Sequence, residues 1–136
     1  MNIIDIKKVN LDKIKSISKT SFWFVFLPLL LGSLIYVMAR DSSIYFLQFL
    51  PIKGYKIELP YWVQYHLPDG LWAFAFSALV ALVWEDVQST GYYVWLGVLV
   101  TVSIGLEVFY GTFDWYDLVF ILIGIGGAYW IFKRKK

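Results

Sequence analysis

The chain has no cysteine and few charged residues, and each shortage excludes a class of protein. Without cysteine there are no disulfides, no thiol nucleophile and no zinc–thiolate site. Only 16% of the residues are charged and 60% are hydrophobic, which is far from the composition of soluble domains. The sequence also has no glycine-rich phosphate loop, paired-histidine metal motif or Gly-x-Ser-x-Gly elbow. From this composition we predict a single membrane domain covering residues 1–136.

Four long apolar stretches occupy more than half of the sequence. They cover residues 22–39, 67–84, 92–110 and 115–132. A helix rises about 1.5 Å per residue, so each stretch crosses most of a hydrocarbon layer about 30 Å thick. Tryptophan and tyrosine cluster at the ends of these stretches, as they do at membrane–water interfaces. We therefore predict an all-α polytopic membrane protein built as a four-transmembrane-helix bundle.

Lysine and arginine are concentrated before the first predicted span and after the last. Between the spans lie only Arg40, Lys53 and Lys56. The positive-inside tendency places both termini in the cytoplasm, which requires an even number of crossings. We interpret the basic tail as an orientation signal and expect no nucleic-acid partner. The basic lead and bulky aromatic core of the first span predict a retained anchor rather than a cleaved signal peptide.

Two segments outside the spans are expected at the membrane surfaces. In residues 1–20, apolar side chains recur at near-helical spacing among lysines, which predicts an amphipathic helix on cytoplasmic membrane lipids. Recognition of a specific lipid is the alternative there. Residues 40–66 contain two semi-apolar pieces, 44–50 and 59–67, that are too short to cross. We expect this connection to form short helices or a lid on the outer surface.

Every predicted span brings a polar residue to its outer end, where charges near hydrocarbon need partners or water. We predict that these residues converge on a small cup open to the extracytoplasmic side, and that Trp72 adds a ring face. The candidate ligand-binding residues are His66, Asp69, Trp72, Glu107, Asp114 and Asp117. Glu107 lies within an otherwise apolar segment, and its expected partner is Arg40 or His66.

Each of these polar residues also has a structural explanation. Asp114 is placed to cap the fourth span, and Asp117 and Asp69 are placed to favour the positive ends of helices. His66 alone makes no ligand set. A hard cation such as magnesium or calcium is an alternative occupant of the acids. We expect no metal site and no cofactor.

Residues 124–128 place small side chains four apart, so that another helix can approach closely. Packing within the bundle is the favoured interpretation. The alternative is a homo-oligomer, or a partner membrane protein, held through Gly124–Ala128.

Three short motifs resemble the VanZ-like membrane proteins. They are LPDGLWA at residues 67–73, GLE at residues 105–107 and GTFDWYD at residues 111–117. The spacing from Asp117 to Gly124 and the acid Glu107 also match that family, over roughly residues 66–130. The chain departs from the family in three places. It has Tyr110 where the family has glutamine, no arginine in the following turn, and Ile121 where the family has asparagine.

The resemblance implies a bacterial cytoplasmic-membrane protein of a family linked to tolerance of glycopeptide antibiotics. We predict a non-enzymatic envelope role, in which the cup binds an amphiphile, a lipid-linked envelope component or a partner protein through Trp72, Glu107 and Asp117. One alternative is an enzyme acting on lipid-linked substrates, with Glu107 or Asp117 as base and His66 as its partner. The other is a structural subunit of a larger membrane complex.

Overall fold

The computed structural model describes residues 3–39, 57–85, 87–110 and 114–135, with the side chains of residues 3–7, 9, 107 and 110 outside that description. Over these ranges the chain is helical and contains no strand. Three helical segments are long and apolar enough to cross a membrane, namely Asn10–Ala39, Leu67–Trp84 and Trp115–Arg134. A further helix, α5 (Thr90–Tyr110), is apolar over the shorter stretch Thr90–Leu106. The described chain therefore has three to four helices that could span a bilayer.

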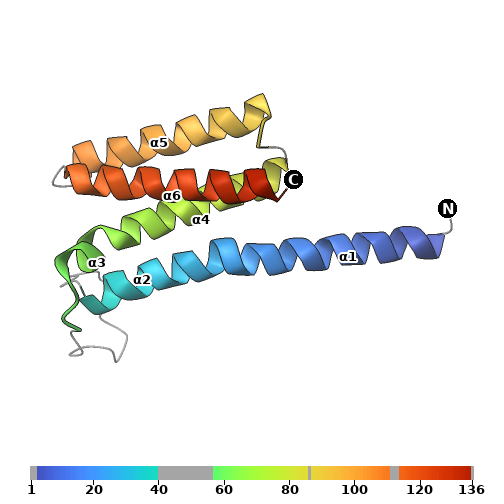
Figure 1. Cartoon of the computed structure of the whole chain (residues 1–136), viewed down its shortest axis with the longest axis horizontal. Helices are drawn as coiled ribbons and strands as arrows, with labels where there is room; N and C mark the ends of the chain where they lie inside the picture. The colour runs from blue at the N-terminus through green and yellow to red at the C-terminus, as the bar shows by residue number, and fades with distance from the viewer. Residues whose placement is uncertain (1–2, 40–56, 86, 111–113, 136) are drawn as a thin grey trace.

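The first three helical elements form one continuous rod. They are α1 (Ile3–Ser21), a single π-helical turn η1 (Phe22–Phe26) and α2 (Leu27–Ala39). No glycine or proline interrupts residues 3–27, and the Leu27 N–H donates to the Phe22 carbonyl across the wide π turn. The expected N-terminal helix is therefore present. However, it continues the line of α2 and extends past the other helices instead of folding back across their ends (Figure 1).

Helix α4 (Leu67–Trp84) lies at the centre of the helix packing. It contacts α2 on one side and α5 and α6 (Trp115–Arg134) on the other (Figure 1). Its buried residues are all small or cyclic: Pro68, Gly70, Ala73, Ala75, Ser77, Ala78 and Ala81. Small side chains let neighbouring backbones approach closely, which is how helices associate where no hydrophobic force acts between them.

The closest approach is between α4 and α6, at a pair of glycines. A Cβ atom added to Gly124 would overlap the carbonyl oxygen of Gly70, and one added to Gly70 would lie 3.0 Å from the carbonyl oxygen of Phe120. Gly124 and Ala128 are both buried, and Ala128 packs in one cluster with Ala78. The chain's own α4 covers these two small residues, so they pack within the bundle. An oligomer or partner contact at Gly124–Ala128 stays a prediction.

The described part of the 40–66 connection, residues 57–66, contains one short helix. Helix α3 covers Tyr61–Tyr65, within the predicted semi-apolar piece 59–67. The Gln64 side-chain amide donates to the carbonyl oxygen of Ala39, so α3 is attached to the end of α2. Residues 40–56, and with them Arg40, Lys53 and Lys56, lie outside the described residues.

Helices α4 and α6 run in the same direction, with both N-termini at the α3 end of the bundle (Figure 1). Their bounds agree with the predicted spans. Helix α4 covers the expected 67–84, while α5 begins two residues before the expected 92 and α6 ends two residues after the expected 132. The polar residues placed at the starts of these two helices are therefore neighbours in space.

We expect Gly124→Ala to destabilise the protein, because the new methyl group meets a backbone oxygen and the helices must separate. The expected loss is about 1–3 kcal/mol in the free energy of unfolding, measured by SDS titration in mixed micelles. Gly126→Ala is the matched control on the same helix, because no atom lies within 4 Å of its added Cβ. Equal stabilities of the two variants would contradict the close contact.

Candidate functional site

The site begins at the junction between α3 and α4, where His66 is held from both sides. Its backbone N–H donates to the Trp62 carbonyl, and its own carbonyl accepts from the Gly70 N–H. Pro68 follows in the first turn of α4 and is buried. His66 is only 3% exposed, so its imidazole is a buried polar group that needs a partner.

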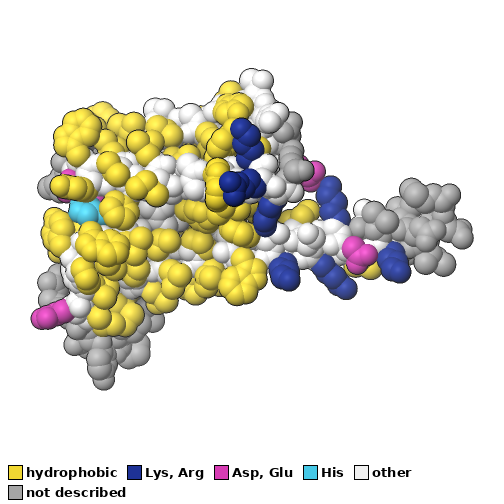
Figure 2. Space-filling model, in the orientation of Figure 1, with side chains coloured by type: hydrophobic (Ala, Val, Ile, Leu, Met, Phe, Trp, Pro, Cys, Tyr) yellow, Lys and Arg dark blue, Asp and Glu magenta, His cyan; other side chains and the backbone are white. Residues whose placement is uncertain are grey.

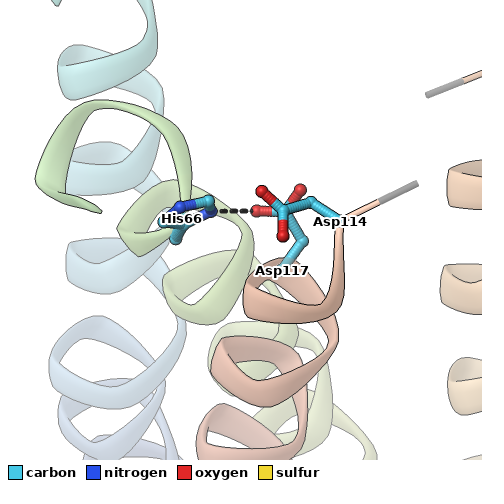
Figure 3. A group of neighbouring side chains, drawn as sticks. All are labelled: His66, Asp114 and Asp117. Atoms are coloured by element: carbon cyan, nitrogen blue, oxygen red, sulfur yellow. Dashed lines mark hydrogen bonds and ion pairs between the residues drawn. The ribbon is translucent and has the colours of Figure 1, made fainter. Parts of the chain in front are cut away.

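That partner comes from the first turn of α6, 51 residues further along the chain. The His66 Nδ1 lies 2.5 Å from Oδ1 of Asp117 (Figure 3). Their side chains are 4% and 13% exposed. With Asp117 ionised, its carboxylate can only accept a hydrogen bond, so Nδ1 is the donor in this contact. The structure therefore joins α6 to the α3–α4 junction by a buried, charge-assisted hydrogen bond.

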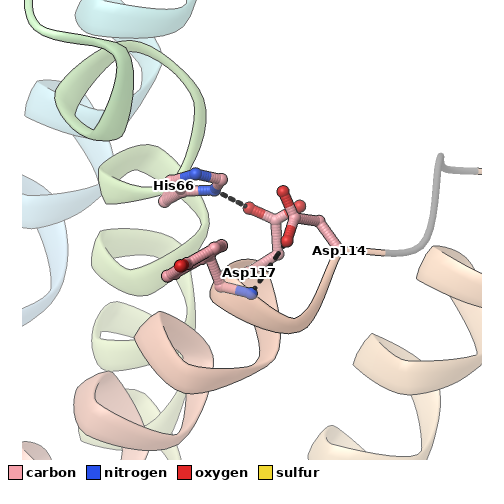
Figure 4. Close-up of polar contacts among 4 residues, drawn as sticks. His66, Asp114 and Asp117 are labelled. Carbon is pink, nitrogen blue, oxygen red and sulfur yellow. Dashed lines mark hydrogen bonds and ion pairs between the residues drawn. The ribbon is translucent and has the colours of Figure 1, made fainter.

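Asp114 is the third member of the group and also begins α6. It has an extended backbone, and its carboxylate accepts from the Tyr116 N–H at 3.0 Å (Figure 4). This is the N-cap role expected from the sequence. One ligand atom from each of His66, Asp114 and Asp117 lies within 4.8 Å of the others. We call these three residues the polar cluster.

The electrostatics of the polar cluster are set by helix ends. The N-termini of α4 and α6 carry partial positive charge, which favours nearby carboxylates. Asp69 lies in the first turn of α4, and Asp117 in the first turn of α6. Over the described ranges, no lysine or arginine forms an ion pair with Asp114 or Asp117. In the described chain, the helix N-termini thus supply partial positive charge near these two acids, and the imidazole supplies a hydrogen-bonding partner for Asp117.

Aromatic rings surround His66. The ring centroids of Tyr61, Tyr116 and Phe120 lie 5.4, 5.6 and 5.9 Å from that of the imidazole. Trp62 stacks on Phe120. Tyr61, Tyr116 and Trp62 are exposed, so the polar cluster is rimmed by rings that face the surroundings. Phe120 was not a candidate from the sequence, although its position four residues after Tyr116 and three after Asp117 places it on the same face of α6.

Three of the six candidate ligand-binding residues, His66, Asp114 and Asp117, come together in the described structure. Trp72 faces α2, where its ring lies 5.6 Å from that of Tyr36 and its Nε1 meets the position of a Cβ on Gly32. Asp69 is half-buried in the first turn of α4.

Glu107 belongs to α5, seven residues after Val100, which packs on the core. The Glu107 side chain lies outside the description, as does the whole of Arg40. The proposed pairing of Glu107 with Arg40 or His66 therefore stays a prediction.

Comparison with known proteins gives no relative. No protein-family model, curated protein or solved structure matches the chain. The resemblance of residues 66–130 to VanZ-like proteins therefore stays a prediction from short motifs. What the site can do is inferred from its own residues: a buried imidazole, two carboxylates and a rim of rings.

A double-mutant cycle of His66→Phe and Asp117→Asn should give a coupling energy of about 1–3 kcal/mol, because a buried hydrogen bond to a charged group is lost. SDS unfolding of the two single variants and the double variant measures it. The control cycle uses Lys13→Met and Glu85→Gln, an ion pair at 3.1 Å whose side chains are 60% and 62% exposed. That exposed pair should couple by under about 1 kcal/mol. A smaller coupling for His66 and Asp117 than for the control would be inconsistent with a buried contact.

Proposed function

We propose that this chain is a multi-pass protein of the bacterial cytoplasmic membrane that binds the head group of an amphiphile or lipid-linked envelope component on its extracytoplasmic side. The observation that supports it is the His66–Asp117 contact, with Asp114 beside it, at the end of helices long enough to cross a bilayer. Polar groups buried among apolar helices are energetically costly unless they pair with each other or bind a ligand.

The proposed orientation rests on the distribution of basic residues. Lys133 and Arg134 lie in the last turn of α6, while Asp117 lies in its first turn. Figure 2 shows the basic side chains gathered at one end of the bundle and along α1, and the histidine at the opposite end. The positive-inside tendency places the basic end in the cytoplasm. With four crossings, both termini are cytoplasmic and the polar cluster faces outward.

The chemistry of the site favours a cationic or hydroxyl-rich head group. Carboxylates accept hydrogen bonds from hydroxyls and pair with cations. The exposed rings of Tyr61, Tyr116 and Trp62 offer faces to a cation or to the apolar side of a sugar. The acyl or prenyl tail of such a ligand would lie along the apolar helices beside the site.

Membership of the VanZ-like family, and with it a role in tolerance of glycopeptide antibiotics, is part of the proposal. Its support is the sequence motifs of residues 66–130. Asp117, one of the matched positions, is also the acid that His66 contacts. A partner membrane protein is an alternative occupant of the site.

A second candidate function is an enzyme acting on lipid-linked substrates. The specific observation is again the contact between His66 and Asp117, because a carboxylate bound to Nδ1 orients an imidazole for proton transfer at Nε2. Turnover of a lipid-linked substrate that is lost in His66→Asn would support it. Binding without turnover supports the first function.

The chain's lack of cysteine allows a direct test of orientation with single cysteines. In intact cells, Glu58→Cys should react with a membrane-impermeant maleimide, because residue 58 is exposed at the polar-cluster end. Lys135→Cys, at the basic end, should react only after the membrane is permeabilised. Labelling is read as a mass shift on a gel. Labelling of residue 135 in intact cells would overturn the proposed orientation.

Head-group binding can be measured with the protein in lipid nanodiscs and EDTA present. The probes are dodecyltrimethylammonium and dodecyl maltoside below their micelle concentrations, which share a tail and differ in head group. Quenching of tryptophan fluorescence should give saturable binding of at least one. Asp117→Asn should weaken it about 10- to 100-fold, because a hydrogen bond to a charged group is removed.

Glu58→Gln is the matched control, since it removes an exposed carboxylate outside the polar cluster. It should bind the probe as the parent chain does. If neither probe binds saturably, or if Asp117→Asn and Glu58→Gln behave alike, head-group binding at the polar cluster is wrong.

In cells, Asp117→Asn should insert normally and change tolerance of a glycopeptide antibiotic.

A further inference from the structure

The polar cluster contains the ligand set of a metal centre: one imidazole nitrogen and two carboxylate oxygens. We propose that His66, Asp114 and Asp117 bind one divalent transition-metal ion, for which Zn²⁺ fits best. Imidazole favours Zn²⁺ over the hard cations magnesium and calcium, and Zn²⁺ also accepts aspartate oxygens. From the sequence a hard cation was only an alternative occupant of the acids, because the chain has a single histidine, 48 residues before Asp114.

The spacing of the ligand atoms suits a single ion. They all lie within 4.8 Å of one another. Zinc–nitrogen and zinc–oxygen bonds are about 2.0–2.2 Å, so two ligands of one ion lie at most about 4.4 Å apart. In the tetrahedral geometry usual for Zn²⁺ the ligand atoms lie about 3.4 Å apart, so the aspartate side chains must rotate to bring their oxygens onto the ion. The backbone of His66 can stay in place. Its N–H donates to the Trp62 carbonyl, and its carbonyl accepts from the Gly70 N–H.

Burial and charge provide an independent reason. The His66 and Asp117 side chains are 4% and 13% exposed and Asp114 is half-buried, so none of the three is fully solvated. The two carboxylates bring two negative charges, and no lysine or arginine of the described chain pairs with them. A bound cation lowers the energetic cost of carboxylates held at the end of an apolar bundle. A divalent ion supplies two positive charges at the point where the three side chains meet (Figure 3).

The existing hydrogen bond identifies two of the atoms that would bind the ion, Nδ1 of His66 and Oδ1 of Asp117. Without the ion, the Nδ1–H of His66 is hydrogen-bonded to Asp117. A nitrogen that binds a metal must be unprotonated. When the ion binds, the proton leaves to solvent and the Asp117 carboxylate turns away from its present contact, because Nδ1 and Oδ1 at their present separation of 2.5 Å are too close for both to be ligands of one tetrahedral ion. Asp114 contributes a carboxylate oxygen while it continues to cap α6 through Tyr116.

Three protein ligands leave at least one coordination position for a further oxygen. An oxygen of a bound head group would fill it, and this step alone rests on the proposed function. Metal binding itself does not depend on it.

The test is a calorimetric titration of ZnCl₂ into untagged, chelator-treated protein in nanodiscs of a zwitterionic lipid. The expected result is one Zn²⁺ per chain. Asp117→Asn and Asp114→Asn should each weaken binding at least about tenfold, while Glu58→Gln binds as the parent chain does. Asparagine caps helices as well as aspartate does, so Asp114→Asn keeps α6 intact. Absence of saturable binding, or unchanged binding in both aspartate variants, would overturn the site.

A second measurement guards against a misfolded variant. Zn²⁺ bound to the folded state raises the thermal midpoint of the parent chain and of Glu58→Gln. It should raise that of Asp117→Asn much less, while the midpoints without metal show that each variant is folded. The head-group titration contains EDTA, so the two proposals fail separately. Zn²⁺ binding without probe binding leaves the metal site standing, and probe binding without Zn²⁺ binding overturns the metal site alone.

Discussion

The contact between Gly70 and Gly124 is the constraint on which the rest of the structure depends. It brings the backbones of α4 and α6 together with no side chain between them. His66 lies four residues before Gly70, and Asp117 lies seven residues before Gly124, or about two turns. Because the two helices are parallel, fixing them at the glycines also fixes the imidazole and the carboxylate opposite each other. The small-residue packing and the polar cluster are therefore one arrangement.

The energetics of the site follow from where it lies. An imidazole that is 3% exposed would be costly without a partner, and so would an aspartate at the same depth. Joined, each satisfies the other, and the parallel helix ends add favourable partial charge. Asp114 lies beside this pair and is half-buried, and Tyr61 and Tyr116, whose rings lie near that of His66, are exposed.

Much of the fold could be predicted from the sequence, because the membrane-spanning signal is local. Hydrophobic length alone placed α4 at its observed bounds, and the apolar stretches placed α5 and α6 within two residues of theirs. The uninterrupted rod from α1 to α2 was not predicted. It depends on the continuation of helical hydrogen bonds through the π turn at Phe22–Phe26, and hydrophobicity does not report on that turn. The Asp114 cap was predictable as well, because its carboxylate bonds to the backbone in the first turn of its own helix.

The site was only partly predictable, because the contact of His66 with Asp117 depends on the relative height of two helices. That height is set by Gly70 against Gly124, and the sequence shows small residues without showing which ones meet. Trp72 illustrates the limit. Its place in a polar helix start suggested a role at the site, but its position six residues after His66 turns its ring toward α2.

The continuous rod has a mechanical consequence. Helix α1 has 19 residues and extends about 28 Å from the π turn. Because no loop separates it from α2, a tilt of α2 by about 10° displaces the tip of α1 sideways by about 5 Å, given that length. A small change in the tilt of α2, which packs against Trp72, would thus give a larger displacement at the far end of the lysine-rich helix α1.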